Sequence, residues 1–119
     1  RKMIDASKRP KISPYVFAGL TAGHYGLKSE DYILDIVCRH FDITKFEIVS
    51  TSRKRNFVLP RHVVCHLVKK YTLLALKDIG WFMGGRDHST IIHSIRAIDN
   101  LIFTDKAFER EYQLIEDKL

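Results

Sequence analysis

Four consecutive polar residues, Asp87-His88-Ser89-Thr90, follow a Gly84-Gly85-Arg86 turn and precede an apolar helical pattern. Their side chains are short donors and acceptors of the kind that contacts base edges in the major groove. An aspartate accepts from cytosine N4, serine and threonine pair with either partner, and a threonine methyl can contact thymine. A simpler explanation is equally open from the spacing alone, because Asp, Ser and Thr are common at the start of any helix.

The elements that would position these residues are a short helix, a tight turn and a longer helix. Residues 77–83 predict the short helix, which ends at Gly84-Gly85, where a left-handed conformation carries no Cβ penalty. The longer helix begins at Asp87 and runs to about Phe103. It has an apolar stripe of Ile91, Ile95, Ile98 and Ile102 and a polar stripe of Ser89, His93, Arg96 and Asn100. This order is typical of a helix-turn-helix, whose second helix enters the major groove.

Positive charge is concentrated near this motif. The formal net charge of the 119 residues is +6, and residues 50–72 contain basic side chains but no acidic ones, whereas 29–49 and 97–119 are net acidic. The basic residues of this block are Arg53, Lys54, Arg55, Arg61, Lys69 and Lys70. A concentrated basic block indicates an anionic polymer as partner. Beside a helix-turn-helix it favours double-stranded DNA, with Arg53-Lys54-Arg55 along phosphates or in a narrow minor groove.

The remaining chain predicts an all-α helical bundle. Residues 29–41 form a helix capped by Ser29, residues 45–49 a short helix capped by Thr44, and residues 105–118 a final helix capped by Thr104. Residues 50–56 are expected to form an exposed loop. Residues 1–28 have no sustained period and predict a basic, partly extended arm, so the helix-turn-helix domain is expected over 29–119.

A helix over about 60–72 is expected to begin at Pro60, whose missing N–H is tolerated in the first turn. Its apolar residues recur at helical spacing and predict a buried face. The opposite side is expected to turn Arg61, His62, Lys69 and Lys70 towards water or a ligand. Because Arg61 and Lys69 are eight residues apart, they share one side and are expected to contact the same DNA backbone.

Other classes of function have weaker support. Cys38 and Cys65 lie in apolar periodic segments and predict reduced core thiols in a cytoplasmic protein. No apolar run approaches the roughly 18 residues that cross a bilayer, so no membrane partner is expected.

The Cys and His residues show no closed four-ligand spacing, so no metal and no cofactor are expected. His88, His93 and Asp87 are too crowded at one helix start for nucleophilic catalysis, so an enzyme is not expected.

A protein-interaction module remains an alternative. The acidic segments 29–49 and 97–119 and the aromatic patch Tyr15-Val16-Phe17 would then dock a replication or regulatory protein, with only non-specific affinity for DNA.

Residues 84–93, Gly-Gly-Arg-Asp-His-Ser-Thr-Ile-Ile-His, closely resemble the GGRDHTTVxH signature of the C-terminal DNA-binding domain of the bacterial replication initiator DnaA. The first helix, the basic loop before Pro60-Arg61, Lys69 and Ile79-Gly80 fall in the same order as in that family. The resemblance covers about 29–119. It implies an all-α, Trp-repressor-like domain that binds duplex DnaA boxes of TTATNCACA type in replication initiation or its regulation, at the bacterial nucleoid.

The resemblance also implies roles for individual residues. Arg53 falls on the minor-groove arginine of the family, and Asp87, His88, Ser89 and Thr90 fall on its major-groove contacts. Phosphate or supporting contacts are implied for Arg61, Lys69, Arg86 and His93, and Lys77 stands where the family often has proline.

Three departures from the family affect the expected recognition sequence. Ser89 replaces threonine, His62 replaces glutamine or glutamate, and Phe57-Val58-Leu59 replaces a more basic run. The chain contains no Gly-x-x-x-x-Gly-Lys-Ser/Thr motif, so it is expected to be either one domain of a longer initiator or a protein that uses the box-binding module alone.

Overall fold

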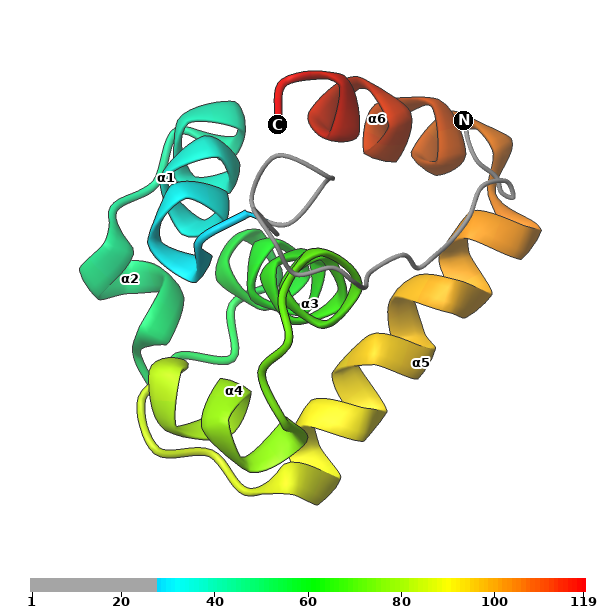
Figure 1. Cartoon of the computed structure of the whole chain (residues 1–119). Helices are drawn as coiled ribbons and strands as arrows, with labels where there is room; N and C mark the ends of the chain where they lie inside the picture. The colour runs from blue at the N-terminus through cyan, green and yellow to red at the C-terminus, as the bar shows by residue number, and fades with distance from the viewer. Residues whose placement is uncertain (1–27) are drawn as a thin grey trace.

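The computed structural model describes residues 28–119, which form six α-helices around one apolar core (Figure 1). The helices are α1 (Glu30–Phe41), α2 (Lys45–Val49), α3 (Arg55–Tyr71), α4 (Leu76–Phe82), α5 (His88–Thr104) and α6 (Lys106–Asp117). No strand occurs in this part of the chain, so the expected all-α class is confirmed. The basic arm expected over residues 1–28 lies almost wholly outside the described residues.

Helix α3 is the centre of the bundle. It packs against α1, α2, α4 and α5 and buries Val64, Leu67 and Val68, as its spacing predicts. Each of the other five helices contributes a fully buried isoleucine to the same core: Ile33, Ile48, Ile79, Ile98 and Ile115. Burying an aliphatic side chain of this size contributes roughly 1.5–3 kcal/mol. The core therefore fixes α4 and α5 to the rest of the domain.

Two of the predicted helix caps are confirmed. The Ser29 hydroxyl accepts from the Tyr32 amide at 3.1 Å, and the acidic residues that follow lie at the positive end of α1. Thr44 and Glu47 form a reciprocal capping box at the start of α2. These local signals define both helix starts.

The start predicted for the third helix is wrong. Helix α3 begins at Arg55 rather than Pro60, and the amides of Phe57 and Val58 both donate to the Lys54 carbonyl at 2.9 Å. Pro60 therefore lies inside the helix, where its missing N–H deprives the Asn56 carbonyl of a helical partner. Pro60 itself is buried and residues 57–59 are half-buried, so packing offsets this loss.

The cap predicted for the last helix is also wrong. Thr104 is the final residue of α5, and its hydroxyl donates to the Asn100 carbonyl at 2.7 Å. Asp105 caps α6 instead, because its carboxylate accepts from the amides of Ala107 and Phe108 at 3.0 and 3.1 Å. A carboxylate at this position also interacts favourably with the helix dipole.

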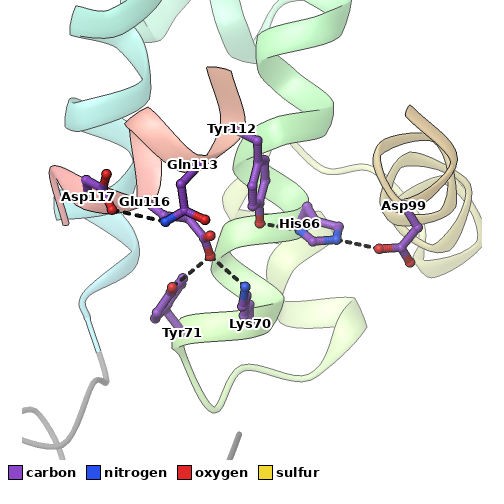
Figure 2. Close-up of polar contacts among 8 residues, drawn as sticks. All are labelled: His66, Lys70, Tyr71, Asp99, Tyr112, Gln113, Glu116 and Asp117. Atoms are coloured by element: carbon purple, nitrogen blue, oxygen red, sulfur yellow. Dashed lines mark hydrogen bonds and ion pairs between the residues drawn. The ribbon is translucent and has the colours of Figure 1, made fainter. Parts of the chain in front are cut away.

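Polar contacts join α6 to the bundle (Figure 2). His66 of α3 lies between two partners: its Nδ1 is 2.6 Å from the Tyr112 hydroxyl, and its Nε2 is 2.7 Å from Asp99 of α5. Burial raises the pKa of Tyr112 well above its usual value, so its hydroxyl stays neutral. The Glu116 carboxylate accepts from Lys70 at 2.6 Å and from the Tyr71 hydroxyl at 2.8 Å. Lys70, expected to face water or a ligand, is exposed and paired with α6.

Tyr112→Phe is expected to lower the free energy of unfolding by about 1–3 kcal/mol, because it leaves His66 Nδ1 without its partner in a partly buried site. Urea denaturation followed by far-UV circular dichroism measures the change. Tyr32→Phe is the matched control: its hydroxyl donates to the Lys118 carbonyl at an exposed site, so its removal should cost less than about 0.5 kcal/mol. Equal losses of unfolding free energy in the two variants would mean that the contact between Tyr112 and His66 does not stabilise the fold more than an exposed hydrogen bond does.

Both cysteines are free and buried, in agreement with the core thiols predicted for them. Burial raises the pKa of the Cys65 thiol to about 11, so this thiol stays protonated at neutral pH. Among residues 28–119, no helix is both long and apolar enough to cross a membrane.

Candidate nucleic-acid interface

Helices α4 and α5 are joined by the tight turn that the sequence predicts. Gly84 and Gly85 have φ values of 94° and 85°, in the left-handed region where only glycine is unstrained. The amides of Gly85 and Arg86 both donate to the Gly80 carbonyl, at 3.0 and 2.9 Å. The turn is therefore fixed to the last turn of α4.

The backbones of α4 and the turn approach each other closely at Gly80. A Cβ atom built on Gly80 would lie 2.0 Å from the Arg86 carbonyl oxygen and 3.6 Å from the Ile91 side chain. In the sequence, Ile79-Gly80 is part of the family pattern, but nothing there predicts this close contact. Glycine here allows α4 to pack directly against the start of α5.

The first turn of α5 presents the predicted base-contacting residues to solvent. His88, Ser89 and Thr90 are exposed, whereas Ile91 behind them is fully buried. The four residues of the polar stripe are exposed as well: Ser89, His93, Arg96 and Asn100. The start of α5 lies at the opposite end of the molecule from α6 (Figure 1).

Asp87 caps α5, which is the simpler of the two roles that the sequence left open for it. One carboxylate oxygen accepts from the Thr90 amide at 2.9 Å, and this hydrogen bond lowers the pKa of Asp87. The capping role and a base-contacting role are compatible, because a carboxylate has two oxygens and several acceptor sites. Asp87 is therefore positioned by the helix that it caps.

Most of the basic residues predicted for the interface are exposed. Arg53 lies in the loop before α3, Lys54 is the residue at the helix start and Arg55 is the first helical residue. The loop is thus shorter than expected, since it ends at Lys54. Lys69 near the end of α3 and Lys77 on α4 are also exposed.

Arg61 does not face water, contrary to the expectation from its spacing with Lys69. Its side chain is only 7% exposed. Its Nε donates to the Ile48 carbonyl at 2.7 Å, and its Nη2 donates to the Ser52 carbonyl at 3.0 Å. The guanidinium therefore holds the end of α2 and the following loop, and it does not share a free surface with Lys69.

Arg86 makes contacts of the same kind from the helix-turn-helix turn. Its Nη1 donates to the carbonyls of Val49, at 3.1 Å, and Met83, and its Nη2 donates to the Ser50 carbonyl at 2.5 Å. A supporting role was one of the two implied for this residue. The partly buried guanidinium joins the turn to α2.

His62 of α3 and His93 of α5 lie side by side, which the sequence did not predict. Their ring centroids are 6.4 Å apart and the rings are perpendicular. Burial, followed by the charges of His93, Arg61 and Arg86, lowers the pKa of His62. His62 is therefore neutral at pH 7 and can donate or accept a hydrogen bond.

Residues 21–98 match the family described as the bacterial dnaA protein helix-turn-helix. The chain belongs to this family. It is similar to the chromosomal replication initiator protein DnaA of Bacteroides thetaiotaomicron, with 39% identity over 91% of this chain and 23% of the relative. The corresponding protein of Xanthobacter autotrophicus is 36% identical over 72% of this chain and 17% of the relative. The chain thus spans about a fifth of the length of these curated relatives.

The DNA-binding helix-turn-helix of the DnaA family corresponds here to α4, the glycine turn and α5. Trp81 of α4 was not predicted as part of this surface, yet it is 82% exposed one helical turn after Lys77. The only signal for it in the sequence was this four-residue spacing. Within the described residues, no group of three or more Cys, His, Asp or Glu side chains could hold a metal ion.

The lowered pKa of His62 makes the stability of this domain depend on pH. Below the unfolded-state pKa of about 6.5, the unfolded chain binds a proton that the native His62 resists, so stability falls as the pH decreases from about 7 to 5. His62→Gln removes the titrating group and should flatten this part of the profile. Urea denaturation at several pH values measures the slope. Equal slopes in the two proteins would contradict the assignment.

Proposed function

We propose that this chain is a sequence-specific double-stranded DNA-binding domain that recognises DnaA-box-type sites of the TTATNCACA form. The observation that carries the proposal is the exposed first turn of α5, where His88, Ser89 and Thr90 are exposed at the start of the second helix of the helix-turn-helix. Short polar side chains at this position of a helix-turn-helix contact base edges in the major groove. The proposed activity is binding, without a catalytic step.

The positions of the charged residues support a two-groove arrangement. With the start of α5 in the major groove, Arg53 would enter the adjacent minor groove, where arginine is attracted by the negative potential. The exposed phosphate-contacting residues would be Lys54, Arg55, Lys69, Lys77 and His93. His62, beside His93, would donate to a phosphate in its neutral form. These contacts would orient the domain on the duplex without selecting its sequence.

The relatives are named chromosomal replication initiator proteins. We therefore place the proposed box binding in replication initiation or its regulation, at the nucleoid in the bacterial cytoplasm. Any further replication or regulatory partner would be recruited to DNA through this domain.

Fluorescence anisotropy at near-physiological salt tests the proposal. The protein is titrated onto a TTATCCACA duplex and onto a scrambled duplex of equal composition. We expect a preference of roughly 10³-fold for the box, together with a strong decrease in affinity as salt increases. The single tryptophan, Trp81, offers a second signal, because it is exposed on the helix-turn-helix.

Two other outcomes would redirect the interpretation. Equal, tight binding to both duplexes would mean that the cations act without base recognition of this box. A selection from random sequences would then establish whether Ser89 and His62 specify a different site. Absence of binding to both would favour the protein-interaction alternative.

Lys69→Ala is expected to weaken binding to box and scrambled duplexes by the same factor and to lower the salt slope by about one, because a phosphate contact carries no sequence information. Anisotropy titrations over a range of salt concentrations measure both quantities. Lys106→Ala on α6 also removes the charge of an exposed side chain and should change neither quantity. A change in box preference with Lys69→Ala would contradict a pure phosphate role.

A further inference from the structure

Two guanidinium groups lie behind the loop that carries Arg53, and both contact main-chain carbonyls. Arg61 donates to the carbonyls of Ile48 and Ser52. Arg86 donates to those of Val49, Ser50 and Met83. The two side chains come from α3 and from the helix-turn-helix turn, so they converge on residues 48–52 from two directions. We call this arrangement the arginine clamp.

The last residue held by the arginine clamp, Ser52, directly precedes Arg53, the residue proposed to enter the minor groove. Arg61 holds the Ser52 carbonyl at 3.0 Å, and the peptide bond formed by that carbonyl leads directly to Arg53. Consecutive Cα atoms are about 3.8 Å apart, so holding Ser52 keeps the Arg53 backbone within that distance of a held residue. Arg86 ties the same loop to the turn that precedes Asp87. The clamp thus joins the two DNA-contacting segments through hydrogen bonds.

The chemistry of these contacts requires arginine. A guanidinium directs several donors in a fixed planar geometry, whereas an ammonium is a point charge on a flexible chain. Among residues 28–119, neither Arg61 nor Arg86 has an acidic partner in an ion pair. Carbonyl groups do not neutralise the two charges, so both contribute to the positive potential that attracts DNA.

We propose that Arg61 and Arg86 are positioning residues for DNA recognition, which hold residues 48–52 against the helix-turn-helix and thereby set the place of Arg53 relative to the start of α5. This inference rests on the proposed function. It predicts that loss of the clamp uncouples minor-groove from major-groove recognition, although neither arginine contacts a base.

Dimethyl sulfate footprinting separates the two grooves, because adenine N3 lies in the minor groove and guanine N7 in the major groove. On the TTATCCACA duplex at saturating protein, Arg86→Gln should lose the adenine N3 protection that Arg53→Ala also loses, while guanine N7 protection remains. Arg86→Lys should not restore it, because the guanidinium reaches these carbonyls from two separate nitrogens, Nη1 and Nη2, whereas an ammonium has a single nitrogen. Arg110→Gln, on the exposed face of α6, is the matched control and should behave as the unmodified protein.

A double-mutant cycle measures the coupling between Arg53 and Arg86 in box binding. Arg53→Ala should weaken box binding about tenfold in the unmodified domain and less than about twofold in the Arg86→Gln background. Equal effects in both backgrounds, or parallel loss of protection in both grooves, would overturn the clamp. Binding of no duplex by the unmodified domain would overturn the proposed function as well, so the two failures are distinguishable.

A second variant keeps the test valid if Arg86→Gln does not fold. Insertion of one glycine between Ser52 and Arg53 leaves both guanidiniums and all their carbonyl partners in place but displaces Arg53. We expect native circular dichroism, retained guanine N7 protection and loss of adenine N3 protection. Unchanged N3 protection would show that Arg53 finds its site without the clamp and would overturn the proposal.

Discussion

Gly80→Ala is expected to lower the free energy of unfolding by about 3 kcal/mol or more, because the new methyl group overlaps the backbone of the turn. Its carbon would lie 2.0 Å from the Arg86 carbonyl oxygen and 3.0 Å from the carbonyl carbon. These are main-chain atoms, so no side-chain rotation relieves the overlap. The Gly80 carbonyl also accepts from the amides of Gly85 and Arg86, and a displaced α4 would weaken both bonds.

Thermal and urea denaturation measure the effect, and Gly85→Ala is the matched control. Gly85 has φ of 85° but no atom within 4 Å of its ideal Cβ position, so the substitution carries only the left-handed penalty of roughly 1–2 kcal/mol. Gly84→Ala should fall between them, because its Cβ would lie 2.9 Å from the Val49 carbonyl oxygen. If Gly80→Ala and Gly85→Ala lowered the free energy of unfolding equally, the overlap of a Cβ atom with the Arg86 carbonyl would not be the reason that position 80 requires glycine.

The elements that were predicted well have their signals within a few residues. Ser29, Thr44 and Asp87 each cap a helix by accepting from the backbone amide three residues later, so the sequence alone places all three at helix starts. The left-handed Gly84 and Gly85 are equally local. The helix-turn-helix was predictable because its turn, its cap and its apolar stripe all lie within about twenty consecutive residues.

The burial of Arg61 and the start of α3 were predicted wrongly because segments distant in sequence decide them, whereas the cap of α6 was displaced by a single residue, from Thr104 to Asp105. Pro60 favoured a helix start, but α3 extends backwards to Arg55, with Leu59 packed against the core and Pro60 buried. Arg61 was expected at the surface because arginine usually is, yet carbonyl groups at positions 48 and 52 provide a buried site for its guanidinium. Helical spacing gives the side of a helix on which a residue lies, but not which backbone carbonyls meet that side.

The residues of the candidate interface also fall into those that a local pattern predicts and those that depend on distant segments. Exposure of His88, Ser89 and Thr90 followed from the position of the buried Ile91 in their own helix. The contact of His62 with His93 depends on how α3 and α5 cross, which no local pattern contains. The arginine clamp was missed for the same reason, since it joins three segments that are separated in sequence.

His88→Ala is expected to reduce the preference for the box duplex by roughly 1–3 kcal/mol, about five- to 150-fold, and to leave stability unchanged. The His88 side chain is exposed at the first position of α5 and forms no hydrogen bond within the described residues, so the free domain does not depend on it. On DNA the same exposed position would place the imidazole at a base edge. Competition titrations with box and scrambled duplexes measure the preference, and urea denaturation measures stability.

Asp87 supplies the contrast, because its carboxylate has a structural role that His88 lacks. Asp87→Ala should lower the free energy of unfolding through loss of the cap to Thr90, whereas Asp87→Ser keeps a capping oxygen and should lower it less. Both remove the carboxylate that would accept from cytosine, so both should reduce discrimination at one base pair. Stability is then expected to depend on whether a capping oxygen is present, and sequence preference is expected to depend on whether the carboxylate is present. A variant series in which box preference followed stability alone would mean that the first turn of α5 supports the helix without contacting bases.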